Sequence, residues 1–401
     1  MTHSALALTR PYPFARLRKL FEGACPPEGL KPISLGIGEP RHPIPKCIAQ
    51  AIAQNIGLMG RYPATGGEIV LRETIASWCE KRYGVALDPT KAILPVLGSR
   101  EALFSFIQSH IDTSRPDPVA VIPTPFYQIY EGAALLAGAR PVFVPLTAET
   151  GFKLNLSHLD EQTLAKTQVV FVCSPGNPTG AVMTLQDWKQ IFELSDRYGF
   201  TIASDECYSE IYFQEGNPPL GALTAAKLLG RDDMKNIIVF QSLSKRSNVP
   251  GMRSGFVAGD HDLIKPFLLY RTYHGSAMNP MIQRASIVAW GTEDHVIENR
   301  RLYREKFAVA YPILSSVLDA PMPEASFYIW TRVPGSDEAF ARALYANQGV
   351  TVLPGSYLSR EACGANPGAG YVRIALVAEP DEVREASERI AKFMNTYNNQ
   401  N

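Results

Sequence analysis

Short apolar runs alternate with longer amphipathic segments from about residue 90 onward. The runs stop at glycine, proline or small polar residues, as buried strands do. The predicted strands are 92–97, 119–122, 142–144, 169–173, 200–203, 237–240 and 255–259. The predicted helices between them include 101–110, 128–137 and 185–198. Strands that alternate with helices in this way indicate an α/β protein with a largely parallel sheet that is covered on both faces.

The pattern differs at the two ends of the chain. The proline-rich residues 1–45 predict an arm with a short helix near 14–21. After about residue 285 the alternation fades, and a long charged helix is expected near 297–314, with its alternating charges on a solvated face. The apolar runs 327–330 and 371–376 predict strands of a smaller α+β domain. We therefore expect an arm that joins the small domain (1–45), a large domain (46–285) and a small C-terminal domain (286–401).

Composition and charge limit the classes of function. Lys plus Arg equals Asp plus Glu, 39 against 39, which argues against nucleic acid or an anionic membrane as the main partner. No apolar run approaches the roughly 20 residues of a membrane span, and the N-terminus lacks a signal-peptide pattern, so we expect a cytoplasmic protein. The six cysteines have no metal-finger spacing, so we expect reduced thiols and no metal site.

The most distinctive chemistry lies in residues 242–255. Lys245 comes just after a predicted strand, where open α/β sheets bind ligands. Ser242 and Ser244 precede the lysine, and Arg253 follows it eight residues later. An amine beside an anion-binding cradle is what a phosphorylated aldehyde cofactor requires. For this motif alone, a solvated lysine in a polar loop remains an equal alternative.

Polar residues also follow other predicted strands. Ser99 and Arg100 begin a helix whose backbone amides would hold a phosphate, Asn177 lies in a proline-glycine turn, and Asp205 precedes Tyr208. Each has a structural explanation of its own as a helix start, a turn or a cap. Because the carboxyl ends of parallel strands share one edge of a sheet, one common site explains them together.

Two further positions attract attention. Gly38 lies in the glycine-proline stretch 35–40, which suits a close backbone approach to a ligand but is equally compatible with a plain turn. Arg373 interrupts an apolar strand. A buried arginine is costly unless paired, so Arg373 is expected to face a cleft and meet a carboxylate, with a structural ion pair as the alternative.

In combination, these motifs resemble the fold-type I, class I/II aminotransferases, which use pyridoxal 5′-phosphate (PLP). S-x-S-K with its arginine, N-P-x-G and D-E-x-Y occur in the family's order across nearly the whole chain. The stretches 98–104, 126–139, 204–213 and 270–275 resemble the proteobacterial N-succinyl-LL-diaminopimelate aminotransferase subgroup. The resemblance implies a large domain with a mostly parallel seven-stranded sheet, a smaller α+β domain, and a homodimer with shared active sites.

The resemblance also implies roles for the site residues around the cofactor ring. Lys245 would bind the cofactor aldehyde covalently and then carry a proton. Asp205 would pair with the protonated pyridine nitrogen. Tyr208 and Asn177 would hydrogen-bond the ring oxygen, and Tyr127 would stack on the ring face.

Other residues would hold the phosphate and the substrate. The implied phosphate ligands are Ser99, Arg100, Ser242, Ser244 and Arg253. Tyr62 would reach the phosphate of the neighbouring subunit. Arg373 would grip the substrate α-carboxylate in a pocket that Asn177 and the Gly38 backbone also border. Arg271 and Arg61 are guesses for the distal carboxylates, because the arginine that aspartate-specific relatives use cannot be located here.

The function that this resemblance implies is amino transfer between N-succinyl-LL-2,6-diaminopimelate and 2-oxoglutarate in lysine biosynthesis. An aspartate, alanine or acetylornithine aminotransferase and a PLP-dependent carbon–sulfur lyase remain alternatives. A PLP-fold effector domain of a transcription regulator is disfavoured, because the arm before the fold is too short and not basic enough for a DNA-binding segment.

Overall fold

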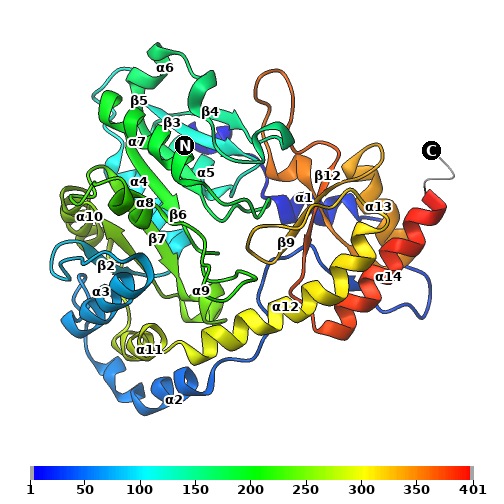
Figure 1. Cartoon of the computed structure of the whole chain (residues 1–401), viewed down its shortest axis with the longest axis horizontal. Coiled ribbons are helices and arrows are strands. Elements are labelled where there is room, and N and C mark those ends of the chain that lie inside the picture. Colours follow the sequence, from blue (N-terminus) through cyan, green and yellow to red (C-terminus); the bar gives the residue numbers. More distant parts are fainter. Residues whose placement is uncertain (1–3, 398–401) are drawn as a thin grey trace.

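A computed structural model of the chain describes residues 4–397 (Figure 1). Its centre is a seven-stranded sheet in the order β2-β8-β7-β6-β5-β3-β4. The strands are β2 (Ile93–Val96), β3 (Val119–Thr124), β4 (Arg140–Pro145), β5 (Thr167–Cys173), β6 (Thr201–Asp205), β7 (Ile237–Ser242) and β8 (Gly255–Gly259). The sheet is mostly parallel, as predicted. Only β8 runs antiparallel to its neighbours, because the chain turns back after β7 and Gly255 pairs opposite Ser242.

Helices cover both faces of this sheet. One face packs against α3 (Ile69–Tyr83), α7 (Leu185–Tyr198), α8 (Ala222–Leu228) and α11 (Pro280–Gly291). The other packs against α4 (Ser99–His110), α5 (Ile129–Leu136) and α10 (His261–His274). In β5, Val170 and Val172 join the first core while Val169 and Phe171 join the second. Successive side chains of a strand point to opposite faces, so a doubly covered strand must be apolar throughout.

A second, smaller core surrounds a three-stranded antiparallel sheet. Its strands are β11 (Leu353–Pro354), β12 (Tyr371–Ala375) and β9 (Tyr328–Arg332), in that order. The helices of this region are α12 (Asp294–Ser315), α13 (Asp337–Gln348) and α14 (Pro380–Tyr397). From the N-terminal part, β1 (Ile33–Ser34) pairs in parallel with β10 (Val350–Thr351). The N-terminal segment thus packs with the C-terminal one, while the domain boundaries at 45 and 285 stay a prediction.

The remaining helices are short. They are α1 (Pro13–Leu20), α2 (Lys46–Gln54), α6 (Glu161–Lys166) and α9 (Leu243–Arg246), and the predicted helix near 14–21 corresponds to α1. All six cysteines are unpaired. Among residues 4–397, no helix combines the length and apolar character needed to cross a membrane.

Helix α12 corrects one prediction. It runs from beside α11 to α14 and so connects the two cores (Figure 1). Arg301 lies on a solvated face, as expected, but Arg300 and Lys306 are buried. Arg300 donates to both carboxylate oxygens of Glu215, at 2.9 and 3.0 Å, and Lys306 donates to the Val377 carbonyl at 3.0 Å. The alternating charges of α12 did not reveal which of its charged side chains are buried, because the elements that cover them lie far away in the sequence.

Candidate active site

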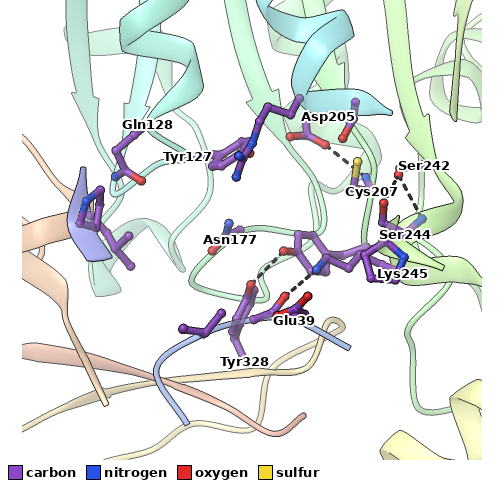
Figure 2. Close-up of a pocket in the computed structure, with 18 of the residues that line it drawn as sticks. Glu39, Tyr127, Gln128, Asn177, Asp205, Cys207, Ser242, Ser244, Lys245 and Tyr328 are labelled. Carbon is purple, nitrogen blue, oxygen red and sulfur yellow. Dashed lines mark hydrogen bonds between the residues drawn. The ribbon is translucent and has the colours of Figure 1, made fainter. Parts of the chain in front are cut away.

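A cavity of about 510 Å³ lies where the carboxyl ends of β5, β6 and β7 face β9 and β12. Figure 2 shows Asp205, Asn177, Lys245 and Tyr328 around this one space. The predicted site residues that line the cavity are Gly38, Ser99, Arg100, Tyr127, Asn177, Asp205, Tyr208, Ser242, Ser244, Lys245, Arg253 and Arg373. The parallel sheet therefore brings together side chains that are far apart in the sequence.

Lys245 lies in the single turn α9, directly after β7. Its Nζ donates to the Gly38 carbonyl oxygen at 2.5 Å. Burial lowers the lysine pKa to about 8, and the positive charges of Arg373 and Arg100 add to this effect. About a tenth of the amine is therefore neutral, and hence nucleophilic, at pH 7, far more than for a free lysine.

Asp205 is the last residue of β6 and is buried. One carboxylate oxygen accepts from the Tyr130 hydroxyl at 2.6 Å, and the other accepts from the Cys207 amide at 3.3 Å. Burial raises the pKa of Asp205, and these hydrogen bonds oppose the increase. Within residues 4–397 Asp205 forms no salt bridge, so a cationic group in the cavity would stabilise its ionised form.

Arg373 points into the same cavity. Its guanidinium donates to the Asn177 side-chain oxygen and the Gly36 carbonyl, both at 2.9 Å, and lies 4.4 Å from the centre of the Tyr328 ring. Its Nε has no hydrogen-bond partner in the described part of the chain. The expected cleft position is observed, but the expected carboxylate partner is not a residue of the described chain. The alternative of a structural ion pair is therefore wrong.

Tyr328 is a cavity residue that sequence reasoning missed. Its hydroxyl lies 2.9 Å from the Tyr208 hydroxyl. Burial, together with the neighbouring Tyr328, raises the pKa of Tyr208 well above its usual value. An alanine Cβ at Gly38 would lie 2.0 Å from the Tyr328 hydroxyl oxygen, so only glycine fits there. Tyr328 belongs to a run that was predicted only as a strand. A tyrosine in an apolar strand resembles any core aromatic, so no local signal distinguished it.

The residues that are predicted to bind a phosphate lie around the start of α9, the turn that carries Lys245. The Ser242 hydroxyl accepts from the Ser244 amide at 3.1 Å, and their hydroxyls are 2.9 Å apart. Ser99 and Arg100 begin α4 and line the cavity, and the first amides of a helix have no hydrogen-bond partner within it. Within residues 4–397, Arg253 donates only to carbonyl oxygens, those of Pro250 at 2.9 Å and Leu97 at 3.2 Å. Hydroxyls, amides and an uncompensated guanidinium form a site for a phosphate-sized anion.

Arg100 lies at the mouth of the cavity. It donates to the Tyr127 hydroxyl at 2.5 Å and to the Tyr12 hydroxyl, from the N-terminal arm, at 3.4 Å. Tyr12 is another residue that the sequence did not indicate. Arg100 and Arg253, which are exposed, and the buried Arg373 form no salt bridge among the described residues, whereas every other buried arginine there does: Arg246, Arg271, Arg300, Arg360 and Arg389. The cavity is therefore prepared for anionic ligands.

Three predicted residues lie elsewhere. Tyr62 and Arg61 are exposed and outside the cavity of their own chain. The guess for Arg271 is wrong, because its side chain is fully buried and donates to both carboxylate oxygens of Glu101, at 2.6 and 2.8 Å. Helix packing of α10 against α4 turns this arginine into a structural ion pair.

Lys245, the buried Asp205 carboxylate and arginines without an acidic partner among the described residues thus line one cavity, an arrangement typical of enzymes with anionic ligands. The class I and II aminotransferase model matches residues 31–390, and the chain belongs to this family. The LL-diaminopimelate aminotransferase of Halothermothrix orenii is 33% identical over 387 residues, which are 95% of each chain.

Solved structures agree with this assignment. An aminotransferase from Neisseria meningitidis Z2491 has 52% identity and a TM-score of 0.95, with 98% of this chain and 100% of that chain covered. A probable N-succinyldiaminopimelate aminotransferase from Thermus thermophilus has 27% identity and a TM-score of 0.81, with 97% and 100% covered. The predicted family and fold class are confirmed.

Proposed function

We propose that the chain transfers an amino group, with PLP as cofactor, from N-succinyl-LL-2,6-diaminopimelate to 2-oxoglutarate. The products would be N-succinyl-2-amino-6-oxopimelate and glutamate, on the route to diaminopimelate and lysine. One observation carries the proposal: Lys245 shares a cavity with three arginines that have no acidic partner in the described chain. We also propose a cytoplasmic location.

The residues of the cavity fit PLP chemically. Ser99, Ser242, Ser244 and Arg253 would hold its phosphate, and Arg100 would add a second positive charge. Among the described residues the buried carboxylate of Asp205 has no cationic partner, and it would hold a protonated ring nitrogen. When bound, PLP supplies an aldehyde carbon for amines and a ring that withdraws electrons from the substrate α-carbon.

The side chains supply the rest of the mechanism. With a pKa of about 8, Lys245 can accept a proton from the substrate α-carbon and return one near neutral pH. Asp205 would supply the negative charge that keeps the ring nitrogen protonated. Tyr208 and Asn177 would donate to the ring oxygen. Arg373 would orient the substrate through its α-carboxylate, so that the α-hydrogen faces the lysine.

The distal part of the substrate is the less defined end. Because Arg100 is assigned to the phosphate, the Tyr12 hydroxyl, 3.4 Å from Arg100 and also in the cavity lining, is the group that would meet a second substrate carboxylate. The similarity to a probable N-succinyldiaminopimelate aminotransferase from Thermus thermophilus supports a succinylated substrate. The similarity to LL-diaminopimelate aminotransferases favours a second candidate, unacylated LL-diaminopimelate.

A competition assay separates these candidates. The purified enzyme is given N-succinyl-LL-diaminopimelate, LL-diaminopimelate, acetylornithine, aspartate and alanine as donors with 2-oxoglutarate. We expect the succinylated donor to have the highest kcat/KM, by about a hundredfold over aspartate if two more charge-assisted contacts form. Preference for LL-diaminopimelate would replace the first candidate by the second. Release of sulfide from cysteine-type substrates without amino transfer would instead indicate a carbon–sulfur lyase.

We further propose a homodimer with shared active sites. Ile56, Met59 and Tyr62 are exposed apolar residues that follow one another closely in the chain, and Tyr273 is also exposed. Large exposed apolar side chains of this kind favour an interface. Mixing an inactive Lys245→Ala chain with an inactive Tyr62→Ala chain should restore activity, because one mixed site then keeps both residues. A monomer in sedimentation analysis would contradict the proposal.

A further inference from the structure

The lysine-bearing turn α9 is held by side chains at both of its ends. The last carbonyl groups of a helix have no partners within it and must be satisfied from elsewhere. At the start of α9, Ser242 caps the turn by accepting from the Ser244 amide. At its end, the side-chain amide of Asn299 in α12 donates to the Lys245 carbonyl at 3.0 Å and to the Arg246 carbonyl at 3.3 Å. Asn299 is buried and does not line the cavity.

The other end of this amide meets His42. Because the Asn299 nitrogen donates to two carbonyls, its oxygen must accept the hydrogen bond from His42 Nδ1, at 2.7 Å. The Nδ1 atom therefore carries the hydrogen. The Nε2 atom is buried and has no hydrogen-bond partner among residues 4–397. Burial and the nearby Lys306 lower the pKa of His42, which keeps the ring neutral and its Nδ1–H fixed as the donor.

We infer that Asn299 and His42 are positioning residues for Lys245, and that they set where its amine stands relative to the cavity. The segment 38–42 is linked to both ends of the lysine residue, directly at the amine and through Asn299 at the main-chain carbonyl. Its Gly38 carbonyl accepts from the lysine Nζ, and its His42 ring reaches the lysine carbonyl through Asn299. Asn248 adds a hydrogen bond to the His42 carbonyl. The inference rests on the proposed function, in which Lys245 is the reacting group.

A purely structural cap is the competing explanation. A cap contributes about 1 kcal/mol of stability, and its loss lowers the melting temperature without altering the lysine. A positioning role predicts in addition that the lysine amine changes its surroundings. Burial lowers the amine pKa to about 8, so an amine displaced toward solvent would titrate closer to the ordinary 10.5.

Matched variants distinguish the two explanations. Asn299→Asp keeps the shape but directs an oxygen at both carbonyls. His42→Leu removes the group that donates to the Asn299 oxygen. His42→Asn places an amide nitrogen near the position of Nδ1 and should therefore restore this hydrogen bond. Ser195→Ala is the control: it removes a buried hydrogen bond to the Phe200 carbonyl, on α7 and away from α9. Each full-length chain is freed of cofactor, treated with an amine-reactive reagent across pH, and analysed at the Lys245 peptide. Melting temperature, kcat and KM are measured alongside.

We expect the midpoint of Lys245 labelling to rise by about one pH unit in Asn299→Asp and in His42→Leu, and to stay unchanged in His42→Asn and Ser195→Ala. In the active enzyme kcat should fall by about a hundredfold in Asn299→Asp, with KM within about threefold, because a displaced catalytic group loses alignment. An unchanged midpoint with only a lower melting temperature would overturn the inference. Should Asn299→Asp not fold, equal behaviour of His42→Leu and His42→Asn would overturn it. Absence of amino transfer in the wild-type enzyme would instead refute the proposed function, since the labelling midpoint does not depend on it.

Discussion

Replacing Gly38 by alanine tests how tightly the cavity wall is packed. The new Cβ would lie 2.0 Å from the Tyr328 hydroxyl oxygen and 2.8 and 2.9 Å from two of its ring carbons. Comfortable contacts between such atoms are about 3.5 Å or more, so the overlap exceeds about 1 Å. Tyr328 is buried and held by Tyr208 and by Arg373 over its ring. The main chain at Gly38 must therefore move, and its carbonyl moves with it away from the Lys245 amine.

The expected magnitude follows from this geometry. Overpacking of a core costs about 1–3 kcal/mol. At an unfolding entropy of about 2.1 cal/mol/K per residue, a chain of 401 residues loses about 1–4 °C in melting temperature. Because a displacement of about 1 Å at a reacting group costs about a hundredfold in rate, kcat should fall by that order. Calorimetry and steady-state kinetics measure both effects.

Two further variants make the reasoning refutable. Gly132→Ala is the matched control, since a Cβ at Gly132 would have no atom within 4 Å. Tyr328→Phe removes the nearest clashing atom at the loss of one hydrogen bond, worth about 1 kcal/mol. In the Tyr328→Phe background, Gly38→Ala should therefore cost less, by a coupling of at least about 0.5 kcal/mol. Strict additivity, or a Gly38→Ala enzyme as active as Gly132→Ala, would show that the contact does not constrain the site.

Lys245→Ala should abolish amino transfer but retain part of the affinity for PLP, because the phosphate ligands do not depend on the lysine. Absorbance after dialysis measures the retained PLP, and turnover measures the amino transfer. Near-wild-type turnover would contradict the prediction. In the cofactor-free chain, the reactivity of Lys245 toward aldehydes should rise as pH increases through about 8, because its lowered pKa leaves the nucleophilic neutral amine at a lower pH than in free lysine. A midpoint near 10.5 would show that the amine is solvated. Asp205→Asn should reduce the single-turnover rate by orders of magnitude, because an amide cannot stabilise a positive ring nitrogen. The melting temperature should be nearly unchanged, because no salt bridge is lost among the described residues. A lower melting temperature with unchanged chemistry would instead identify Asp205 as a cap.

Much of the site could be predicted from local pattern. Apolar runs indicated where the buried strands end, and in a parallel sheet the carboxyl ends meet at one edge. Asn177, Asp205 and Lys245 each follow such a run, and the structure places all three on one cavity. Arg373 was found because a charged residue in an apolar strand requires an explanation. Their roles toward PLP stay proposals that the variants above address.

Other features depended on pairings that no local pattern contains. Arg271 lies in a distinctive motif, yet it pairs with Glu101, 170 residues away, because α10 packs against α4. The reversal of β8 depends on how the chain returns after β7, and the apolar run alone is compatible with either direction.

The contacts that shape the reacting amine are of the same kind. The Lys245 amine donates to the Gly38 carbonyl, which is 207 residues away in the sequence, and Tyr328 of β9 packs against Gly38. Buried positions recur every two residues in a strand and every three to four residues in a helix, so the sequence itself indicates which side chains are buried. Which buried side chains then touch depends on how whole helices and sheets pack, and only the folded chain decides that.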